Sequence, residues 1–86
     1  MNELLNLPNI GPVLVEELAN IGITTYEDLA ETGSVEIVLK LGHQDEMVCY
    51  NRLYAIEGAI QRKRWHAIPK EERQTLKKHL INALKI

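Results

Sequence analysis

The sequence predicts an all-α fold, a compact bundle of about five or six helices with a helix-hairpin-helix-like element at its N-terminal end. Three observations lead to this prediction. Apolar residues recur at helical spacing, the alternation typical of strands is absent, and Gly or Pro separates the periodic stretches. A chain of 86 residues suffices for one core. We therefore expect a single domain over residues 1–86, with the hairpin element at about 2–32 and the C-terminal helices at about 45–86.

The hairpin element is predicted from a sharp turn between two short amphipathic stretches. Ahead of the turn, Leu4, Leu5 and Leu7 give a first helix its apolar face, and a proline then ends that helix. A second proline suits the first turn of the next helix, whose apolar stripe includes Val13 and Leu18. The turn residues are Pro8, Asn9, Ile10, Gly11 and Pro12, and Gly22 ends the second helix in the left-handed conformation typical of a C′ position.

The middle of the chain predicts two further short helices. Thr25 is placed to cap the first of them, and Glu27 and Asp28 follow in its first turn, near the positive end of the helix dipole. Ser34 is placed to cap the second, which ends at Gly42. Both stretches have apolar residues to bury, so we expect them to complete the N-terminal half of the bundle.

The C-terminal half predicts two longer helices. From about Asp45 to Trp65, apolar residues recur at spacings of four, three and four, which gives a central helix one buried face. The residues of this face are Cys49, Leu53, Ile56 and Ile60. Pro69 opens the last helix, in which acidic residues precede basic ones, the order that the helix dipole favours.

Charge divides the chain into two unlike halves. Residues 1–39 contain seven acids and no Lys or Arg, whereas residues 40–86 contain ten bases and five acids. The formal net charge of −2 therefore conceals a strong asymmetry. A duplex-binding surface gathers Lys and Arg, because phosphate neutralisation supplies most of the non-specific affinity. The acidic half, which contains the hairpin, would instead repel DNA.

The hairpin turn has two interpretations that the sequence leaves open. Backbone N–H groups around Asn9, Ile10 and Gly11 could hold one DNA phosphate, or the turn could simply connect two helices. In the usual helix-hairpin-helix turn, Gly stands on both sides of the apolar residue. Here Asn9 replaces the first Gly, and Pro12 removes a donor just after the second. These departures favour the architectural interpretation.

The bases of the second half are better candidates for a nucleic-acid or partner surface. These residues are Arg52, Arg62, Lys63, Arg64, Lys77 and Lys78. Trp65 follows three of them and could stack on a nucleobase, but the chain has no other Trp, so a structural role where two helices meet is the simpler interpretation. We also expect a structural role for Cys49, on the apolar face of its helix.

Enzymatic and membrane functions find no support in the sequence. The three His residues lack the spacing and company of a metal site, and phosphate-loop, dinucleotide and nucleophile-elbow motifs are absent. We therefore expect no catalysis, no cofactor, no metal and no membrane partner. The lone Cys, together with the absence of a signal peptide or membrane span, predicts a cytoplasmic protein.

Several short motifs stand in a specific order along nearly the whole chain. They are Leu-Pro-Asn-Ile-Gly-Pro at 7–12, Gly-Ile at 22–23, Tyr-Glu-Asp-Leu at 26–29, Leu-Tyr-Ala-Ile-Glu-Gly-Ala-Ile at 53–60, and Arg-Trp-His at 64–66 with Pro69. In this order they resemble the C-terminal domain of the TfoX/Sxy competence regulators. The resemblance implies a helical, helix-hairpin-helix-like domain without known catalysis, in bacterial proteins that promote expression of DNA-uptake genes, a process called DNA transformation.

The fuller members of that family carry a separate N-terminal domain, whereas here Met1 stands just ahead of the hairpin. We therefore expect a bacterial regulatory or accessory module that acts by contact with transcription machinery or with a separately encoded protein. Direct, weakly sequence-specific DNA binding is one alternative, and a homo-oligomeric scaffold, such as a homodimer, is another. DNA binding predicts an affinity that falls steeply with salt, whereas an apolar protein interface responds little.

Overall fold

The computed structural model describes residues 3–42 and 46–84. Over these residues it contains five α-helices, two short 3-10 helices and no strand, which confirms the predicted all-α fold. The elements are η1 (Glu3–Asn6), α1 (Pro12–Asn20), α2 (Tyr26–Thr32), α3 (Ser34–Leu41), α4 (Glu46–Ile60), η2 (Trp65–Ala67) and α5 (Lys70–Leu84). Asp45, where the central helix was expected to begin, lies outside the described residues.

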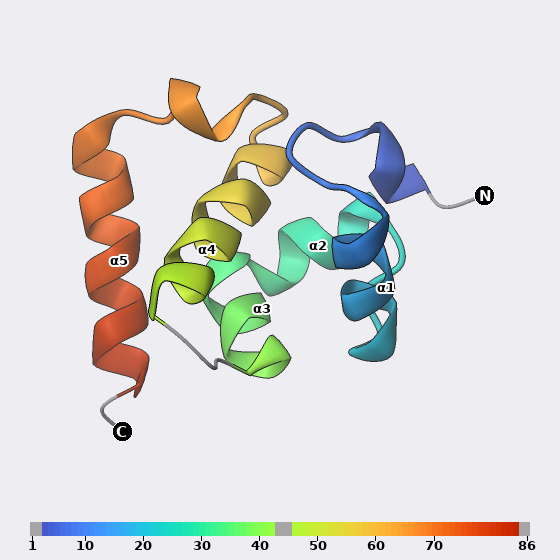
Figure 1. Ribbon diagram of the computed structural model, residues 1–86, viewed down its shortest axis with the longest axis horizontal. Helices are drawn as coiled ribbons and strands as arrows, with labels where there is room; N and C mark the ends of the chain where they lie inside the picture. Colours follow the sequence, from blue (N-terminus) through green and yellow to red (C-terminus); the bar gives the residue numbers. More distant parts are fainter. Residues whose placement is uncertain (1–2, 43–45, 85–86) are drawn as a thin grey trace.

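Helix α4 is the centre of the bundle, as the sequence predicts. It contacts α2, α3, η2 and α5. Figure 1 shows α4 in the middle, with α5 along one side and the hairpin with α1 on the other. Of its predicted apolar face, Cys49, Leu53 and Ile56 are buried and Ile60 is half-buried. The largest fully buried side chains are Leu4, Leu18, Leu29, Ile37, Val38, Leu53, Ile56, Ile68 and Leu80.

The prediction that α4 continues to Trp65 is wrong, because the helix ends at Ile60. Arg62 takes a left-handed backbone conformation, with φ of 59°. The Lys63 N–H then donates to the Gly58 carbonyl at 2.9 Å, and the Arg62 N–H donates to the Ala59 carbonyl at 3.1 Å. This pair of bonds is the Schellman motif, which usually has Gly at the left-handed position. Since Arg stands there instead, no stop signal marks this helix end in the sequence.

Helix α1 ends as expected but presents a different face to the core. Gly22 has φ of 85°, and the Ile23 N–H donates to the Leu18 carbonyl at 2.9 Å, which completes a second Schellman motif. Val13, placed by prediction on the apolar stripe, is 72% exposed. The buried stripe consists of Leu18 with the half-buried Leu14 and Val15, and Val13 lies off this stripe at 100° per residue.

The prediction for Thr25 is confirmed and that for Ser34 is wrong. The Thr25 hydroxyl accepts a hydrogen bond from the Asp28 N–H at 3.1 Å, which caps α2. The N-cap of α3 is Gly33, and no side chain caps this helix. The Ser34 hydroxyl instead donates to Glu57 Oε1 at 2.7 Å. Ser34 is buried where α3 meets α4, and a buried hydroxyl needs a hydrogen-bond partner.

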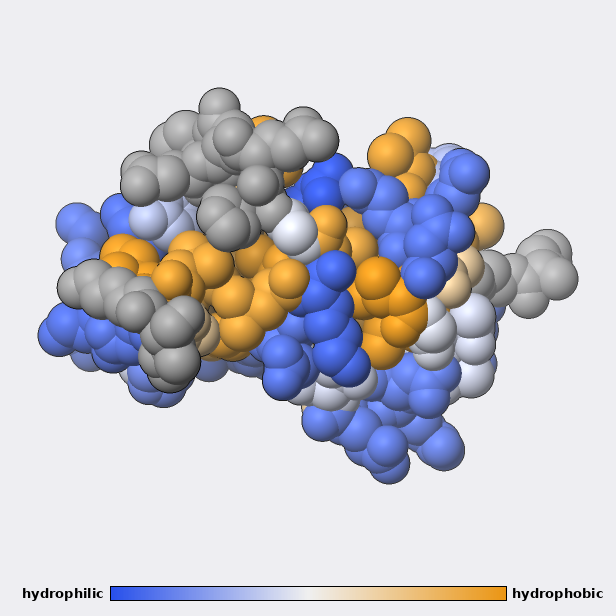
Figure 2. Space-filling view, turned by 90° about the horizontal axis from the view of Figure 1, so that it is seen from below, coloured by the Kyte–Doolittle hydropathy of each residue, from blue (hydrophilic) through white to orange (hydrophobic). Residues whose placement is uncertain are grey.

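Four large apolar residues are exposed over the described part of the chain. The exposed large apolar residues there are Leu5, Val13, Val48 and Leu84. Leu5 was expected in the core, but at 44% exposure it lies on the outer side of η1, whereas Leu4 and Leu7 are buried. Figure 2 shows one face of the molecule, on which a band of hydrophilic residues divides the hydrophobic surface. None of the described helices is long and apolar enough to cross a membrane.

Candidate functional site

The Asn9 side chain joins the hairpin turn to the end of α4. The Asn9 residue has a left-handed backbone conformation, with φ of 69°, which Asn tolerates better than most residues. The Asn9 Nδ2 donates to the Lys63 carbonyl at 3.0 Å and to the Ala55 carbonyl at 3.4 Å, and Oδ1 accepts from the Trp65 N–H at 3.3 Å. We call these three bonds the Asn9 clamp. The Asn that replaces the usual Gly thus makes contacts that Gly could not make.

Gly58 on α4 leaves the space that the clamp requires. A Cβ atom at this position would lie 2.5 Å from Asn9 Nδ2, 2.8 Å from the Lys63 carbonyl oxygen and 3.2 Å from the Trp65 nitrogen. Sequence reasoning assigned Gly58 no role. A signal was present, however, because a Gly inside an apolar helical stretch weakens the helix and often marks a close approach by another segment.

A hollow of about 510 Å³ opens beside the clamp. We call it the Trp65 hollow, and it is lined by Asn9, Asn51, Tyr54, Ala55, Arg64 and Trp65. The rings of Tyr54 and Trp65 are inclined by 19°, with centroids 6.3 Å apart. Both rings belong to half-buried residues, whereas Asn51 and Arg64 are exposed. The hollow therefore combines aromatic surface, amide groups and one guanidinium.

Two further side chains surround the Trp65 ring. The His66 ring lies 4.0 Å from it between centroids, and the Arg73 guanidinium carbon lies 5.7 Å from the Trp65 centroid. The Arg73 Nε is buried and has no hydrogen-bond partner within the described structure. Trp65 is thus held by rings and a cation, and it lies at the edge of the core rather than within it.

The structure separates the six candidate bases instead of gathering them in one patch. Arg52 Nη2 forms an ion pair with Glu17 Oε2 of α1 at 2.8 Å. The Arg62 guanidinium lies over the Tyr26 ring, 4.1 Å from its centroid, and Lys77 Nζ lies 4.6 Å from the centroid of Tyr50. Each of these three bases therefore has a partner within the molecule.

The other three candidate bases have different surroundings. Arg64 lines the Trp65 hollow. Lys63 is half-buried and its carbonyl accepts from Asn9, while Lys78 is exposed on α5. Of the six candidates, Arg64 is thus the one that the structure places with Trp65 in a common hollow. Cys49, predicted to be structural, lies buried in α4 with 3% exposure.

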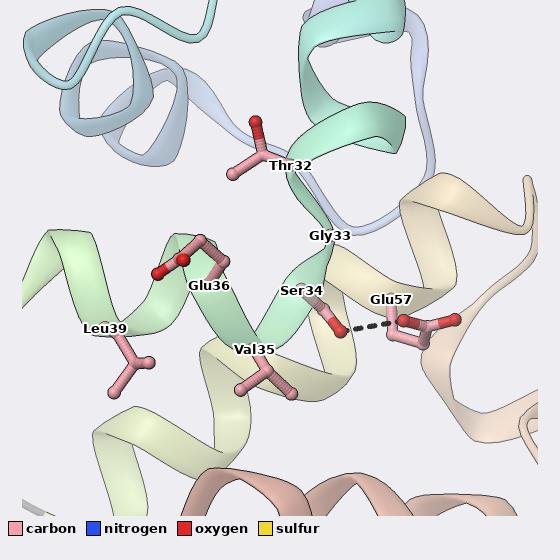
Figure 3. Close-up of a pocket in the computed structure, with 7 residues that line it drawn as sticks. All are labelled: Thr32, Gly33, Ser34, Val35, Glu36, Leu39 and Glu57. Carbon is pink, nitrogen blue, oxygen red and sulfur yellow. Dashed lines mark hydrogen bonds between the residues drawn. The ribbon is translucent and has the colours of Figure 1, made fainter. Parts of the chain in front are cut away.

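A second hollow, of about 400 Å³, lies where α2, α3 and α4 meet. Figure 3 shows the Ser34 hydroxyl directed at Glu57 across it. Behind this pair, Gln61 Nε2 donates to Glu57 Oε2 at 2.7 Å and to Glu72 Oε1 at 2.8 Å. The polar groups here bond one another and tie α3, α4 and α5 together, so they stabilise the fold. No cluster of three potential metal ligands occurs among the described residues.

Both sequence and structure match known proteins. The TfoX C-terminal domain family matches residues 1–80. A crystal structure of an uncharacterized protein from Listeria monocytogenes, in a triclinic form, is 41% identical with a TM-score of 0.81, over 93% of this chain and 91% of that one. A tetragonal-form crystal structure of a protein of unknown function, also from Listeria monocytogenes, has the same identity and TM-score over 94% and 99%. No curated protein matches the sequence. The chain belongs to the TfoX C-terminal domain family.

Proposed function

We propose that this domain is a non-catalytic bacterial regulatory or accessory module that acts by binding another protein, such as a component of the transcription machinery. The Asn9 clamp carries this proposal. In a DNA-binding helix-hairpin-helix element the turn approaches a phosphate with its backbone N–H groups, whereas here the Asn9 side chain holds the turn against the end of α4 and the segment that follows it.

The distribution of charge supports the same proposal. Acidic residues Glu16 and Glu17 follow the turn on α1, and Glu17 neutralises Arg52, one of the bases that a DNA surface would need. Arg62 and Lys77 lie against tyrosine rings. These candidate bases therefore do not form a row of free cations along which a phosphate backbone could bind.

The Trp65 hollow supplies what a protein interface commonly uses. Binding energy at interfaces concentrates on Trp, Tyr and Arg side chains in well-packed depressions. The hollow contains one residue of each kind, Trp65, Tyr54 and Arg64. We therefore assign the partner contact to this surface.

Direct DNA binding is the second candidate, and one observation favours it. Arg64 and Arg73 lie close to the Trp65 ring, a combination that can stack a base and pair with a phosphate. Titration of labelled duplex and single-stranded DNA at low and moderate salt distinguishes the two candidates, with the Arg64→Glu variant beside a matched Lys40→Glu control. Lys40 is an exposed residue in the last turn of α3.

The proposed protein-binding role predicts no DNA binding even at low salt, where phosphate attraction is strongest. Salt-sensitive binding that Arg64→Glu removes and Lys40→Glu retains would contradict it. Light scattering addresses the third class of function, a homo-oligomeric scaffold. We expect the mass of the 9.8 kDa monomer, and a stable multiple of that mass without DNA affinity would favour the scaffold.

A further inference from the structure

We infer that the Trp65 hollow binds a short acidic segment of the partner protein, in which an aromatic side chain stands next to a carboxylate. The inference rests on the proposed function and specifies the chemistry of the partner. It follows from the juxtaposition of two nearly parallel rings, one exposed guanidinium and an exposed amide around a single hollow.

The rings account for the aromatic part of the ligand. Aromatic pairs prefer offset-stacked or edge-to-face arrangements with centroids about 4.5–7 Å apart, and the Tyr54–Trp65 pair lies within this range at 6.3 Å. Both residues are half-buried, so part of their surface borders the hollow. A hollow of about 510 Å³ is large enough to receive one further ring with its neighbouring backbone.

The charges account for the carboxylate. Arg64 is exposed, and its planar guanidinium matches a carboxylate in bidentate geometry. The Arg73 guanidinium, 5.7 Å from the Trp65 centroid, adds positive potential beside the hollow. None of the residues that line the hollow is acidic, although residues 1–39 are strongly acidic. The hollow is therefore complementary to a negative ligand within a chain of net negative charge.

The amide group fits a peptide, and the single base of the hollow argues against a nucleic-acid strand. An Asn side chain both donates and accepts, which matches the alternating N–H and C=O groups of a peptide backbone. Asn51 is exposed at the hollow and can make such contacts. A nucleic-acid strand needs successive cations for successive phosphates, but Arg64 is the one base among the lining residues.

The Asn9 clamp fixes the shape of the hollow before a ligand arrives. Asn9 bonds the backbone of Lys63 and Trp65, the residues on either side of Arg64. Arg64 and Trp65 are therefore held in place relative to α4, which supplies Asn51 and Tyr54. A preorganised site loses less conformational entropy on binding.

Intrinsic fluorescence tests the inference directly, because Trp65 is the only Trp in the chain and reports on the hollow alone. The full chain is titrated with a short peptide of Asp and Glu around one central Phe. Three control probes accompany it: the same peptide with Ala for Phe, the same peptide with Lys for its acids, and oligothymidylate. Each probe is also titrated into Arg64→Glu and Lys40→Glu, two exposed charge reversals whose folding is checked by circular dichroism.

We expect a saturable change of Trp65 emission with the acidic Phe peptide. Arg64→Glu should weaken this binding by about tenfold or more, since a charge-assisted bond is lost and a repulsion introduced. Removal of the Phe should also weaken it, whereas Lys40→Glu should change it by less than about twofold, because α3 ends at the opposite end of the molecule from η2 (Figure 1).

Three results would overturn the inference. One is an absent or Arg64-independent response to the acidic Phe peptide. Another is a stronger response to oligothymidylate, which would assign the hollow to nucleic acid. The third is an emission change that depends on protein concentration alone, which would assign it to a second copy of the chain. If the peptide fails while DNA also fails to bind, this inference falls and the proposed protein-binding role does not, because other partner chemistries remain for that role.

Discussion

Replacement of Gly58 by Ala tests whether the Asn9 clamp organises this fold. On an isolated helix this change is favourable, since Ala exceeds Gly in helix propensity by about 1 kcal/mol. In the folded protein the added Cβ would lie 2.5 Å from Asn9 Nδ2 and 2.8 Å from the Lys63 carbonyl oxygen. The second of these atoms belongs to the backbone, which cannot move aside as a side-chain end can.

The expected loss follows from these contacts. Overpacking of this kind costs about 1–3 kcal/mol, and each clamp bond that breaks costs about 1 kcal/mol more. With overpacking at about 2 kcal/mol, about two clamp bonds broken and the gain in helix propensity subtracted, the free energy of unfolding should fall by about 3 kcal/mol. A chain of this size has a total stability of about 4–13 kcal/mol. Because about 1 kcal/mol shifts the melting temperature of such a domain by about 4–8 °C, the melting temperature should fall by about 12–24 °C.

Thermal and urea unfolding, followed by circular dichroism, measure this loss. The double variant Asn9→Gly/Gly58→Ala supplies the control, because removal of the carboxamide relieves the shortest of the three contacts. The double variant should therefore lose less stability than the sum of the two single variants. If Gly58→Ala is as stable as the parent chain, or more stable, the Asn9 clamp does not organise this fold.

Three further variants test other parts of the structure by the same unfolding measurements. Asn9→Gly retains the left-handed backbone but deletes the clamp, so it should destabilise by about 2 kcal/mol, and an unchanged midpoint would show that the clamp contributes nothing. Gln61→Leu removes the shared donor between Glu57 and Glu72 and should cost about 2 kcal/mol, whereas a stabilised variant would mean that the helices do not need this tie. Thr25→Ala should cost about 1 kcal/mol through the lost cap of α2, with Thr24→Ala, a neighbouring exposed residue, as a near-neutral control.

The helical framework could be predicted from the sequence because local signals agree with the final packing. Thr25 is a preferred capping residue and does cap α2, and Gly22 stands where a left-handed residue is needed. The buried face of α4 follows from the spacing of its apolar residues, and Leu53 and Ile56 on this face are fully buried. The family resemblance was confirmed by the match over residues 1–80.

The remaining features depend on contacts between segments far apart in the chain. Arg62 ends α4 although Arg carries no stop signal, and Ser34 leaves its expected capping role for a carboxylate on another helix. The clamp joins Asn9 to a backbone segment more than 50 residues away, at Lys63 and Trp65. No local pattern encodes such a pairing, so sequence reasoning could weigh the roles of the turn but could not identify its partner.

Photo-crosslinking in bacterial cells shows whether the Trp65 hollow contacts another protein. A benzophenone side chain replaces Ala67, an exposed residue of η2 that makes none of the proposed contacts, and a second chain carries it at the exposed Glu31 of α2 as a control. We expect a nuclease-resistant adduct with another protein from position 67 that Arg64→Glu removes, and none from position 31. An adduct that nuclease digests instead, or no adduct from position 67, would contradict this expectation.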